Sequence, residues 1–287
     1  MLKDLIQEVM WSLMGNKVRS GLTILGIVIG IASVITMVGI GQGSKKSIET
    51  QIESIGSNLI MIMPGSQSVG GVRQSSGSAQ SLTEEDVDIL KEKVSSIKAI
   101  APAVTGNYQI TAKANNSNTQ VIGTTVDYTS VKNVTVESGS FFTESQVRSS
   151  AKVAVIGPDT RDDLFGEEAN PIGQTIRINK VIFQVIGVTK AKGGSGFNNQ
   201  DDIVYVPMKT SQNYLAGNDY ISNINITVNS QDEMTLAEEQ ITATLLESHG
   251  IESEEDADFR TMNQNDIIST ASSITSTFTI LLSSIAG

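Results

Sequence analysis

The 287-residue sequence contains no cysteine and a single histidine, His249. Disulfides and thiolate metal sites are therefore excluded. With no cysteine and no second histidine, neither a conventional zinc site nor a nucleophilic triad can be assembled. His249 stands directly before a glycine at a predicted helix end, a position typical of a capping or surface residue. We therefore expect no catalytic residue and no metal ligand.

Basic residues are scarce. Lys and Arg number 20 against 31 Asp and Glu, which gives a net charge of −11 and a pI near 4.6. This balance argues against a nucleic-acid partner and against a broad basic surface held on anionic lipid. The acidic run 252–258 (ESEEDAD) lacks the glycine and ligand spacing of a calcium loop, so it indicates a solvated acidic segment. A low aromatic content of 5% suits a solvated extracytoplasmic domain.

A phosphate-binding loop is also missing. The run Gly39-Ile-Gly-Gln-Gly-Ser-Lys-Lys-Ser47 is rich in glycine and lysine. The true loop needs a glycine, four residues and then Gly-Lys-Ser/Thr, after a strand and before a helix. No glycine here satisfies that spacing, and the run follows an apolar helix instead. We expect no nucleotide site, no cofactor and no enzymatic activity in this chain.

One long apolar stretch is present near the N-terminus. The residues between Arg19 and Lys45 carry no charge, and about 20 apolar residues suffice to cross a bilayer. A secretory signal would have a shorter core, a shorter leader and an Ala-x-Ala-like cleavage site. We predict a retained transmembrane helix over 21–43. Gly26 and Gly30 form a Gly-x-x-x-Gly pair, a candidate surface for packing against another helix.

Two further segments are predicted to contact the membrane. Residues 1–20 carry apolar residues at helical spacing with charges between them, which indicates a cytoplasmic amphipathic helix that lies on lipid or on a docked partner. Residues 267–287 are uncharged and apolar, yet stop without interfacial anchors. We interpret them as the start of a second transmembrane helix, within which the chain is truncated.

Between these segments lies a predicted extracytoplasmic domain, 44–266. A strand at 58–63, a helix begun by a Ser81–Glu84 capping box and a strand at 98–104 form one β-α-β unit. A strand at 221–228, a helix with Leu236, Ile241, Leu245 and Leu246 on its buried stripe, and a strand at 258–262 form another. Such a repeat predicts an α+β, ferredoxin-like core in which strands 58–63 and 221–228 share one sheet.

The core is assigned to 50–104 and 220–265, and 105–219 is predicted to be an inserted β-rich subdomain that is nearly free of helix. It includes a hairpin in which 175–178 turns at Asn179-Lys180 into 181–188. The pairs Asp162-Asp163 and Asp201-Asp202 lie beside turn-like sequence and are expected to be loop charges. Two polar segments, 66–80 and 193–200, are predicted to be mobile loops.

Several stretches resemble the MacB-type permeases of ATP-binding-cassette transporters. The runs that carry this resemblance follow one another in family order along the whole chain: 17–31 (KVRSGLTILGIVIGI), 40–43 (IGQG), 137–143 (ESGSFFT), 155–158 (VIGP), 164–166 (LFG), 170–179 (NPIGQTIRIN) and 192–207 (KGGSGFNNQDDIVYVP). The last run is the most specific of them.

This resemblance implies a permease of the cytoplasmic (inner) membrane with four transmembrane helices and a large extracytoplasmic domain between the first and second. It implies a homodimer that relays ATP-driven motion outward, with a separate ATPase subunit, since no ATPase domain is fused here, and an extracellular or periplasmic adaptor (membrane fusion) protein. Gly193, Gly194, Ser195, Gly196 and Phe197 become a candidate partner-contact loop.

The expected function is therefore that of an export permease subunit for peptides, antibiotics or lipid-linked molecules. Two alternatives stay open. One is a membrane-anchored binding or sensor domain that transports nothing, which would need no returning span. The other is a permease of the same superfamily that acts in lipoprotein release or cell division.

Overall fold

The structure is a computed structural model of the 287-residue chain. It describes residues 15, 17–55, 58–65, 68–69, 72–73, 79–167, 169–193 and 199–263, together with 266, 273, 277 and 280. Of the predicted helix over 1–20 the structure describes 15 and 17–20, and of the predicted second span over 267–287 it describes 273, 277 and 280; the rest of both predictions lies outside the described residues. The chain divides into two units, one of residues 1–51 and 267–287 and the other of residues 52–266.

The first unit contains most of helix α2 (Lys17–Ile55), a single helix of 39 residues. Its part Lys17–Gly43 is the one helix in the described chain that is long and apolar enough to cross a membrane, with a mean hydropathy of 2.4 and no buried residue. The hydroxyls of Thr23, Ser33 and Thr36 donate to carbonyl oxygens four residues earlier. Because hydrocarbon offers no hydrogen-bond partner, this pairing keeps the polar side chains satisfied within the helix.

The second unit begins as the β-α-β repeat predicts. Its first half consists of β1 (Leu59–Pro64), α3 (Glu84–Lys93) and β4 (Ile97–Ala112). Its second half consists of β11 (Asn223–Val228), α8 (Met234–His249) and β12 (Phe259–Asn263), with the 3-10 turns η3 (Gln231–Glu233) and η4 (Glu254–Asp256) flanking α8. The strands lie in the order β12-β1-β11-β4, all neighbours antiparallel. The fold class is α+β with a ferredoxin-like repeat, and the predicted pairing of 58–63 with 221–228 is confirmed.

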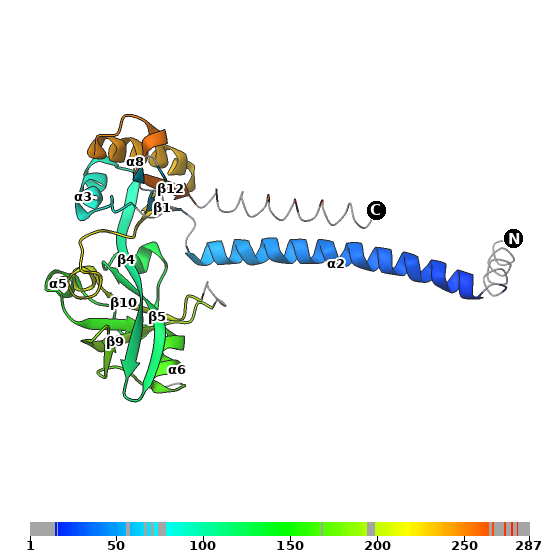
Figure 1. Ribbon diagram of the computed structural model, residues 1–287, viewed down its shortest axis with the longest axis horizontal. Coiled ribbons are helices and arrows are strands. Elements are labelled where there is room, and N and C mark those ends of the chain that lie inside the picture. The colour runs from blue at the N-terminus through cyan, green and yellow to red at the C-terminus, as the bar shows by residue number, and fades with distance from the viewer. Residues whose placement is uncertain are drawn as a thin grey trace. The chain divides into compact units, whose positions relative to one another are not determined.

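Helices α3 and α8 cover one face of this sheet (Figure 1). They enclose a core in which Ile60, Leu90 and Ile226 are fully buried. Alternation along β1 and β11 explains the arrangement, because every second residue of each strand points to the helices. The other sheet face carries Leu59, Ala101 and Ala103 into a different apolar cluster.

The start of α3 differs from its prediction. Its reciprocal cap is formed by Thr83 and Asp86, not by Ser81 and Glu84: the Thr83 N–H donates to Oδ2 of Asp86 at 2.8 Å. The Ser81 hydroxyl instead donates to the Asp258 carbonyl, 2.8 Å away. Both pairs have capping-box spacing in the sequence, so only the tertiary bond of Ser81 decides between them.

Helix α8 ends at His249, and Gly250 follows with φ +66°, a left-handed conformation that favours glycine. Two expectations about this helix are wrong. Leu236 is not on the buried stripe, since 54% of it is exposed, and Met234 and Ala237 occupy the core in its place. His249 is not a surface residue either: its side chain is 11% exposed and lies between two carboxylates.

Strand β4 runs through the predicted boundary at 104/105. Its first part pairs with β11 and its later part with β5 (Asn115–Thr124), so one strand of 16 residues belongs both to the ferredoxin-like core and to the inserted segment. The pairing with β5 continues without a break through Gly106 and Asn107. Figure 1 shows β4 extending from the end with α3 and α8 towards the end with β9 and α6.

Beyond β4, the strands of residues 105–219 form a closed ring. The remaining strands are β6 (Val136–Gly139), β7 (Val153–Ile156), β8 (Thr175–Ile178), β9 (Val181–Thr189) and β10 (Ile203–Pro207). The ring runs β4-β5-β10-β7-β9-β8 and closes because β8 pairs with both β9 and β4, while β6 adds to β9 outside it. The predicted hairpin at Asn179-Lys180 is confirmed, and both turn residues have positive φ.

The two faces of the ring form separate cores. Ala154, Ile156, Val204 and Phe183 point inward with the apolar residues of β5 and β8. Their strand neighbours Val153, Val155, Ile203 and Tyr205 point outward, against Tyr128 and Phe142. This separation follows from the period of two along a strand.

The expectation that 105–219 is nearly helix-free is wrong. It contains α4 (Tyr128–Val131), α5 (Glu144–Arg148), α6 (Pro158–Phe165), α7 (Met208–Ser211) and the π-helical turn η2 (Gln212–Ala216). These helices are too short to show an apolar stripe of helical period. Asp162 and Asp163 lie on α6 and not in a loop.

Of the predicted loop 66–80, the structure describes 68–69, 72–73 and 79–80. The first two pairs form the short antiparallel strands β2 (Ser68–Val69) and β3 (Val72–Arg73), which the loop prediction did not include.

Candidate functional site

The candidate partner-contact loop joins β9 to β10. Gly194, Ser195, Gly196 and Phe197 lie outside the described residues, and Gly193 is described, with φ +79°. What the structure defines is the base of this loop, formed by residues 190–193 on one side and 199–202 on the other. We call these two segments the loop base.

Asp201 connects the two sides of the loop base. Its Oδ1 accepts a hydrogen bond from the N–H of Lys192 at 2.8 Å, and its Oδ2 accepts one from the N–H of Gly193 at 2.9 Å. Asp201 is buried, with only 7% of the residue exposed. Hydrogen bonds to a buried charged group are worth about 1.5–3 kcal/mol each, so this carboxylate fixes where the loop leaves β9.

The start of α6 holds the other side of the loop base. Asp159 receives a hydrogen bond from Asn199 Nδ2 at 2.6 Å, and its own N–H donates to the Asp201 carbonyl at 3.2 Å. Thr160 Oγ1 donates to Asp202 Oδ1 at 3.1 Å. Asp201 and Asp202 do lie in a loop as expected, but each has a defined structural partner.

Gly157, the residue before α6, makes this packing possible. A Cβ on Gly157 would lie 2.1 Å from the Asp201 carbonyl oxygen. Because a side-chain carbon cannot approach an oxygen that closely, the backbone of 157 and the backbone of 201 can touch only if residue 157 is glycine. The Gly157 N–H also donates to the Ile203 carbonyl at 2.8 Å.

Two lysines interact at the loop base, Lys192 within it and Lys132 beside it. The ammonium group of Lys192 donates to the carbonyl oxygen of Lys132 at 2.6 Å. Burial, together with the charge of Lys192, lowers the pKa of Lys132 to about 8. Burial also lowers the pKa of Lys192, which the Asp201 charge partly offsets. Burial raises the pKa of the neighbouring Tyr205 above the ordinary tyrosine range, and the charge of Asp201 adds to this.

The other candidate site is the glycine pair of α2. A Cβ placed on Gly26 or Gly30 would meet nothing within 4 Å, so the helix surface over both residues is open. The large apolar side chains around them, such as Ile27 and Ile29, are more than half exposed. An open small-residue surface on an apolar helix suits close approach of another helix in a bilayer, and this role stays a prediction.

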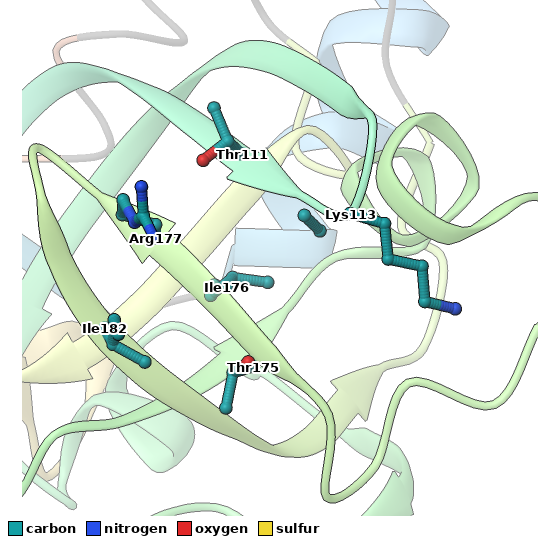
Figure 2. Close-up of a pocket in the computed structure, with 7 residues that line it drawn as sticks. Thr111, Lys113, Thr175, Ile176, Arg177 and Ile182 are labelled. Carbon is teal, nitrogen blue, oxygen red and sulfur yellow. The ribbon is translucent and has the colours of Figure 1, made fainter.

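Two depressions lie on the surface of the described residues, and the wider one, of about 560 Å³, is open to solvent and lined by Glu144, Ser145, Arg148 and Ser149 on and beside α5. The other, of about 170 Å³, lies where β4 meets β8 and is lined by Thr111, Thr175 and Arg177, among others. Figure 2 shows the Lys113 side chain extending away from Arg177, so these two cations do not converge on one ligand. Nor do three His, Asp or Glu side chains gather into a possible metal site anywhere in the described residues.

The fold is that of an α+β domain preceded by a helix long and apolar enough to span a membrane: this helix is followed by a ferredoxin-like core that carries a β-rich ring. The model of the MacB-like periplasmic core domain matches residues 20–244. The chain therefore belongs to the family of proteins with a MacB-like periplasmic core domain.

Curated relatives support this assignment. The macrolide export ATP-binding/permease protein MacB of Bdellovibrio bacteriovorus is 39% identical over 276 residues, which make up 96% of this chain and 42% of the relative. The protein of the same name from Chlorobium luteolum is 37% identical over 281 residues, 98% of this chain and 42% of the relative. The chain thus spans about two fifths of the length of the curated relatives it matches.

Solved structures share the fold. The periplasmic region of MacB from Actinobacillus actinomycetemcomitans aligns with a TM-score of 0.64 and 26% identity, covering 78% of this chain and 97% of that one. The extracellular domain of YknZ, a noncanonic ABC-type transporter from Gram-positive bacteria, aligns with a TM-score of 0.59 and 21% identity, covering 72% of this chain and 100% of that one.

Proposed function

We propose that this chain is the part of an export permease that transmits motion from the cytoplasmic membrane to an extracytoplasmic domain. The energy comes from an ATP-binding-cassette ATPase, proposed to act as a separate subunit; the 287 residues themselves contain no phosphate loop. The permease acts as a homodimer, contacts an adaptor protein outside the membrane, and drives efflux of peptides, antibiotics or lipid-linked molecules.

The observation that carries this proposal is how the chain connects its apolar helix to its sheet. Helix α2 continues without a break past the apolar segment that ends at Gly43, as far as Ile55. Strand β1 then begins at Leu59. A continuous helix is a stiff element, so under the proposal a shift or tilt of the membrane segment would be carried along α2 as far as Ile55.

The pairing of β1 with β12 adds a second connection. Ile60 pairs with Asn263, so the start of β1 lies beside the end of β12. Both ends that lead out of the folded domain, towards α2 and towards 267–287, therefore leave from one end of one antiparallel pair. Under the proposal, opposed movements of two membrane segments would act directly on this pair.

The partner-contact loop is assigned to the output side. Its base is clamped by Asp201 and by the start of α6, so a rigid scaffold presents it. Loops held on rigid scaffolds are frequent binding elements. We propose that Gly193 to Phe197 contact the adaptor or the second protomer.

A flexible insertion tests the relay. In the permease containing this chain, co-expressed with its ATPase and adaptor, a six-residue Gly-Ser segment is inserted between Ile55 and Leu59. The matched control carries the same insertion at the exposed Asn179-Lys180 turn. We expect the first variant to lose export while membrane insertion and ATP hydrolysis persist, and the control to export normally. Equal export by both variants would contradict the relay.

A second experiment tests the loop. Replacing Gly193–Gly196 with a stiff segment should reduce export but leave membrane insertion and assembly with the ATPase intact. Full export by that variant would remove the loop from the mechanism.

A further inference from the structure

The single histidine lies between two carboxylates that come from different parts of the chain. Nδ1 of His249 is 2.7 Å from Oδ1 of Asp258, and Nε2 is 3.0 Å from Oδ1 of Asp86. A carboxylate can only accept a hydrogen bond, and a neutral imidazole has only one N–H. Both contacts are satisfied at once only by the imidazolium cation. We call these three residues the His249 latch.

The surroundings of the ring favour its protonated form. Burial lowers the pKa of His249, but the hydrogen bonds and the charges of Asp258 and Asp86 raise it by more, so the net pKa lies above the ordinary value. The charged groups that face the ring are Asp86 from α3 and Asp258 from the segment before β12, while Phe259 presents its uncharged ring edge-on at 5.8 Å. On α8 itself, Glu247 is paired with Lys93.

The latch connects separate structural elements. His249 is the last residue of α8, and Asp86 lies in the first turn of α3, where its other oxygen caps the helix at Thr83. The backbone of Asp258 is bound as well: its carbonyl accepts from the Gly65 N–H at 2.7 Å and from the Ser81 hydroxyl at 2.8 Å. Since Pro64 pairs with Phe259, the latch holds the end of the β1–β12 pair that lies opposite the exits towards the membrane segments.

The two carboxylates differ in access to water. The Asp86 side chain is 4% exposed and the Asp258 side chain 37% exposed. When the ring loses a proton, one carboxylate must face a lone pair. Asp258 can exchange its lost bond for water, whereas Asp86 would be left buried without a donor on that oxygen. The neutral ring therefore keeps its proton on Nε2, which donates to Asp86, and the contact between Nδ1 and Asp258 breaks.

We propose that the His249 latch is a protonation-controlled link, which holds the start of β12 on α3 and α8 when the ring is charged and releases it when the ring becomes neutral. The sign follows from the raised pKa. The stabilisation is fully present below the unfolded pKa, about 6.5, and is lost as the pH rises through the higher folded value. An alkaline exterior would thus loosen β12 at the latch. This inference concerns proton binding alone and does not depend on transport.

A titration of the full chain in detergent micelles tests the latch. Because the sequence has one histidine, a histidine labelled with ¹³C at Cε1 gives a single ring signal in the NMR spectrum. We expect its titration midpoint above about 6.5, with the backbone amide signals of Asp258 and Gly65 shifting at the same midpoint. A midpoint at or below that of free histidine would overturn the proposal, and so would amide signals that ignore the ring titration.

Two matched variants separate the latch from general electrostatics. Asp258→Asn and Glu247→Gln each remove one negative charge near the end of α8. Asp258→Asn should lower the ring midpoint by roughly one unit, because an opposite charge in direct contact shifts a pKa by about that amount or more. Glu247→Gln should leave it almost unchanged, since the Glu247 side chain is 71% exposed and screened by water. Equal shifts in both variants would overturn the assignment of Asp258 to the latch.

Discussion

Gly157→Ala is expected to damage the loop base even though alanine suits the local backbone. The φ of residue 157 is −75°, which any residue adopts, so the substitution brings no strain of its own. The added Cβ would instead lie 2.1 Å from the Asp201 carbonyl oxygen and 2.8 Å from its carbonyl carbon. Both atoms belong to backbone, so the backbone itself must move.

Overpacking of this kind costs about 1–3 kcal/mol. For a domain of this size, each kcal/mol lowers the melting temperature by roughly 2–4 °C, so a decrease of roughly 2–12 °C is expected. The displacement of residue 201 should also weaken the bonds from Lys192 and Gly193 to its carboxylate. Hydrogen exchange at these two amides should become faster.

Gly106→Ala is the matched control. A Cβ there would lie 2.6 Å from the ring of Tyr108, which is the far end of a side chain that can rotate away. Calorimetry and hydrogen exchange on both variants should show a large effect only for Gly157→Ala. If that variant keeps the wild-type melting temperature and amide protection, the close packing of α6 on the loop base does not restrain the loop.

Three further predictions concern the same domain. Phe183→Ala empties a fully buried position inside the strand ring and should lower the free energy of unfolding, measured with denaturant, by about 3–5 kcal/mol. Ile182→Ala, at a neighbouring site that is 54% exposed, should lower it by about 0.5 kcal/mol or less. Similar losses in both variants would show that the ring interior is not packed. Asp201→Asn keeps one acceptor oxygen for two N–H groups, so hydrogen exchange at Lys192 or Gly193 should accelerate and stability should fall by about 1–3 kcal/mol. Unchanged exchange at both amides would show that the Asp201 side chain does not hold the loop base. The pKa of Lys132 is lowered to about 8 in the folded protein, so between about pH 8 and 10 the unfolded chain binds more protons and the stability of the wild type should rise with pH. Lys132→Met should therefore be more stable than wild type at pH 7, by up to about 3 kcal/mol. This gain should vanish above about pH 10.

The predictable part of the fold is the part with strong periodicity. Ile60, Ile224 and Ile226 alternate with polar or less buried residues, and that pattern places and pairs their strands correctly. The Asn179-Lys180 hairpin is predictable because adjacent strands and a turn dipeptide are local features. The long apolar helix is predictable because an uncharged stretch of its length is rarely compatible with a soluble fold, and its place in a membrane stays a prediction.

What could not be predicted depends on contacts between distant residues. Ring closure requires β8 to pair with β4, which is distant in the chain, and nothing local in Ile176 or Ile178 specifies that partner. The role of His249 depends on Asp86, 163 residues earlier, so the sequence neighbours of His249 indicate the wrong environment. The short helices of 105–219 take their stability from packing, which leaves little periodic trace.

Some local signals do mark features that the sequence-based prediction omits. Gly157-Pro158 combines a glycine with a proline at the first helical position, which marks the start of α6. Asp201 is visible as a carboxylate next to the loop, but its two backbone donors come from Lys192 and Gly193 across the loop and cannot be inferred from composition. The loop candidates Gly194 to Phe197 and the glycine pair of α2 rest on family resemblance and spacing, and their roles stay predictions.

The shared strand β4 gives the domain a mechanical advantage. At about 3.3 Å per residue, its 16 residues extend over roughly 50 Å from the sheet of β1 and β12 to the far rim of the ring. Neighbouring strands hydrogen-bond to it along its length, which stiffens it. A pivot of about 5° at one end would displace the other by roughly 4 Å, which is about the separation of adjacent strands. Under the proposed relay, a lever of this length would turn a slight tilt of the β1–β12 pair into a step large enough to break or make a contact at its tip.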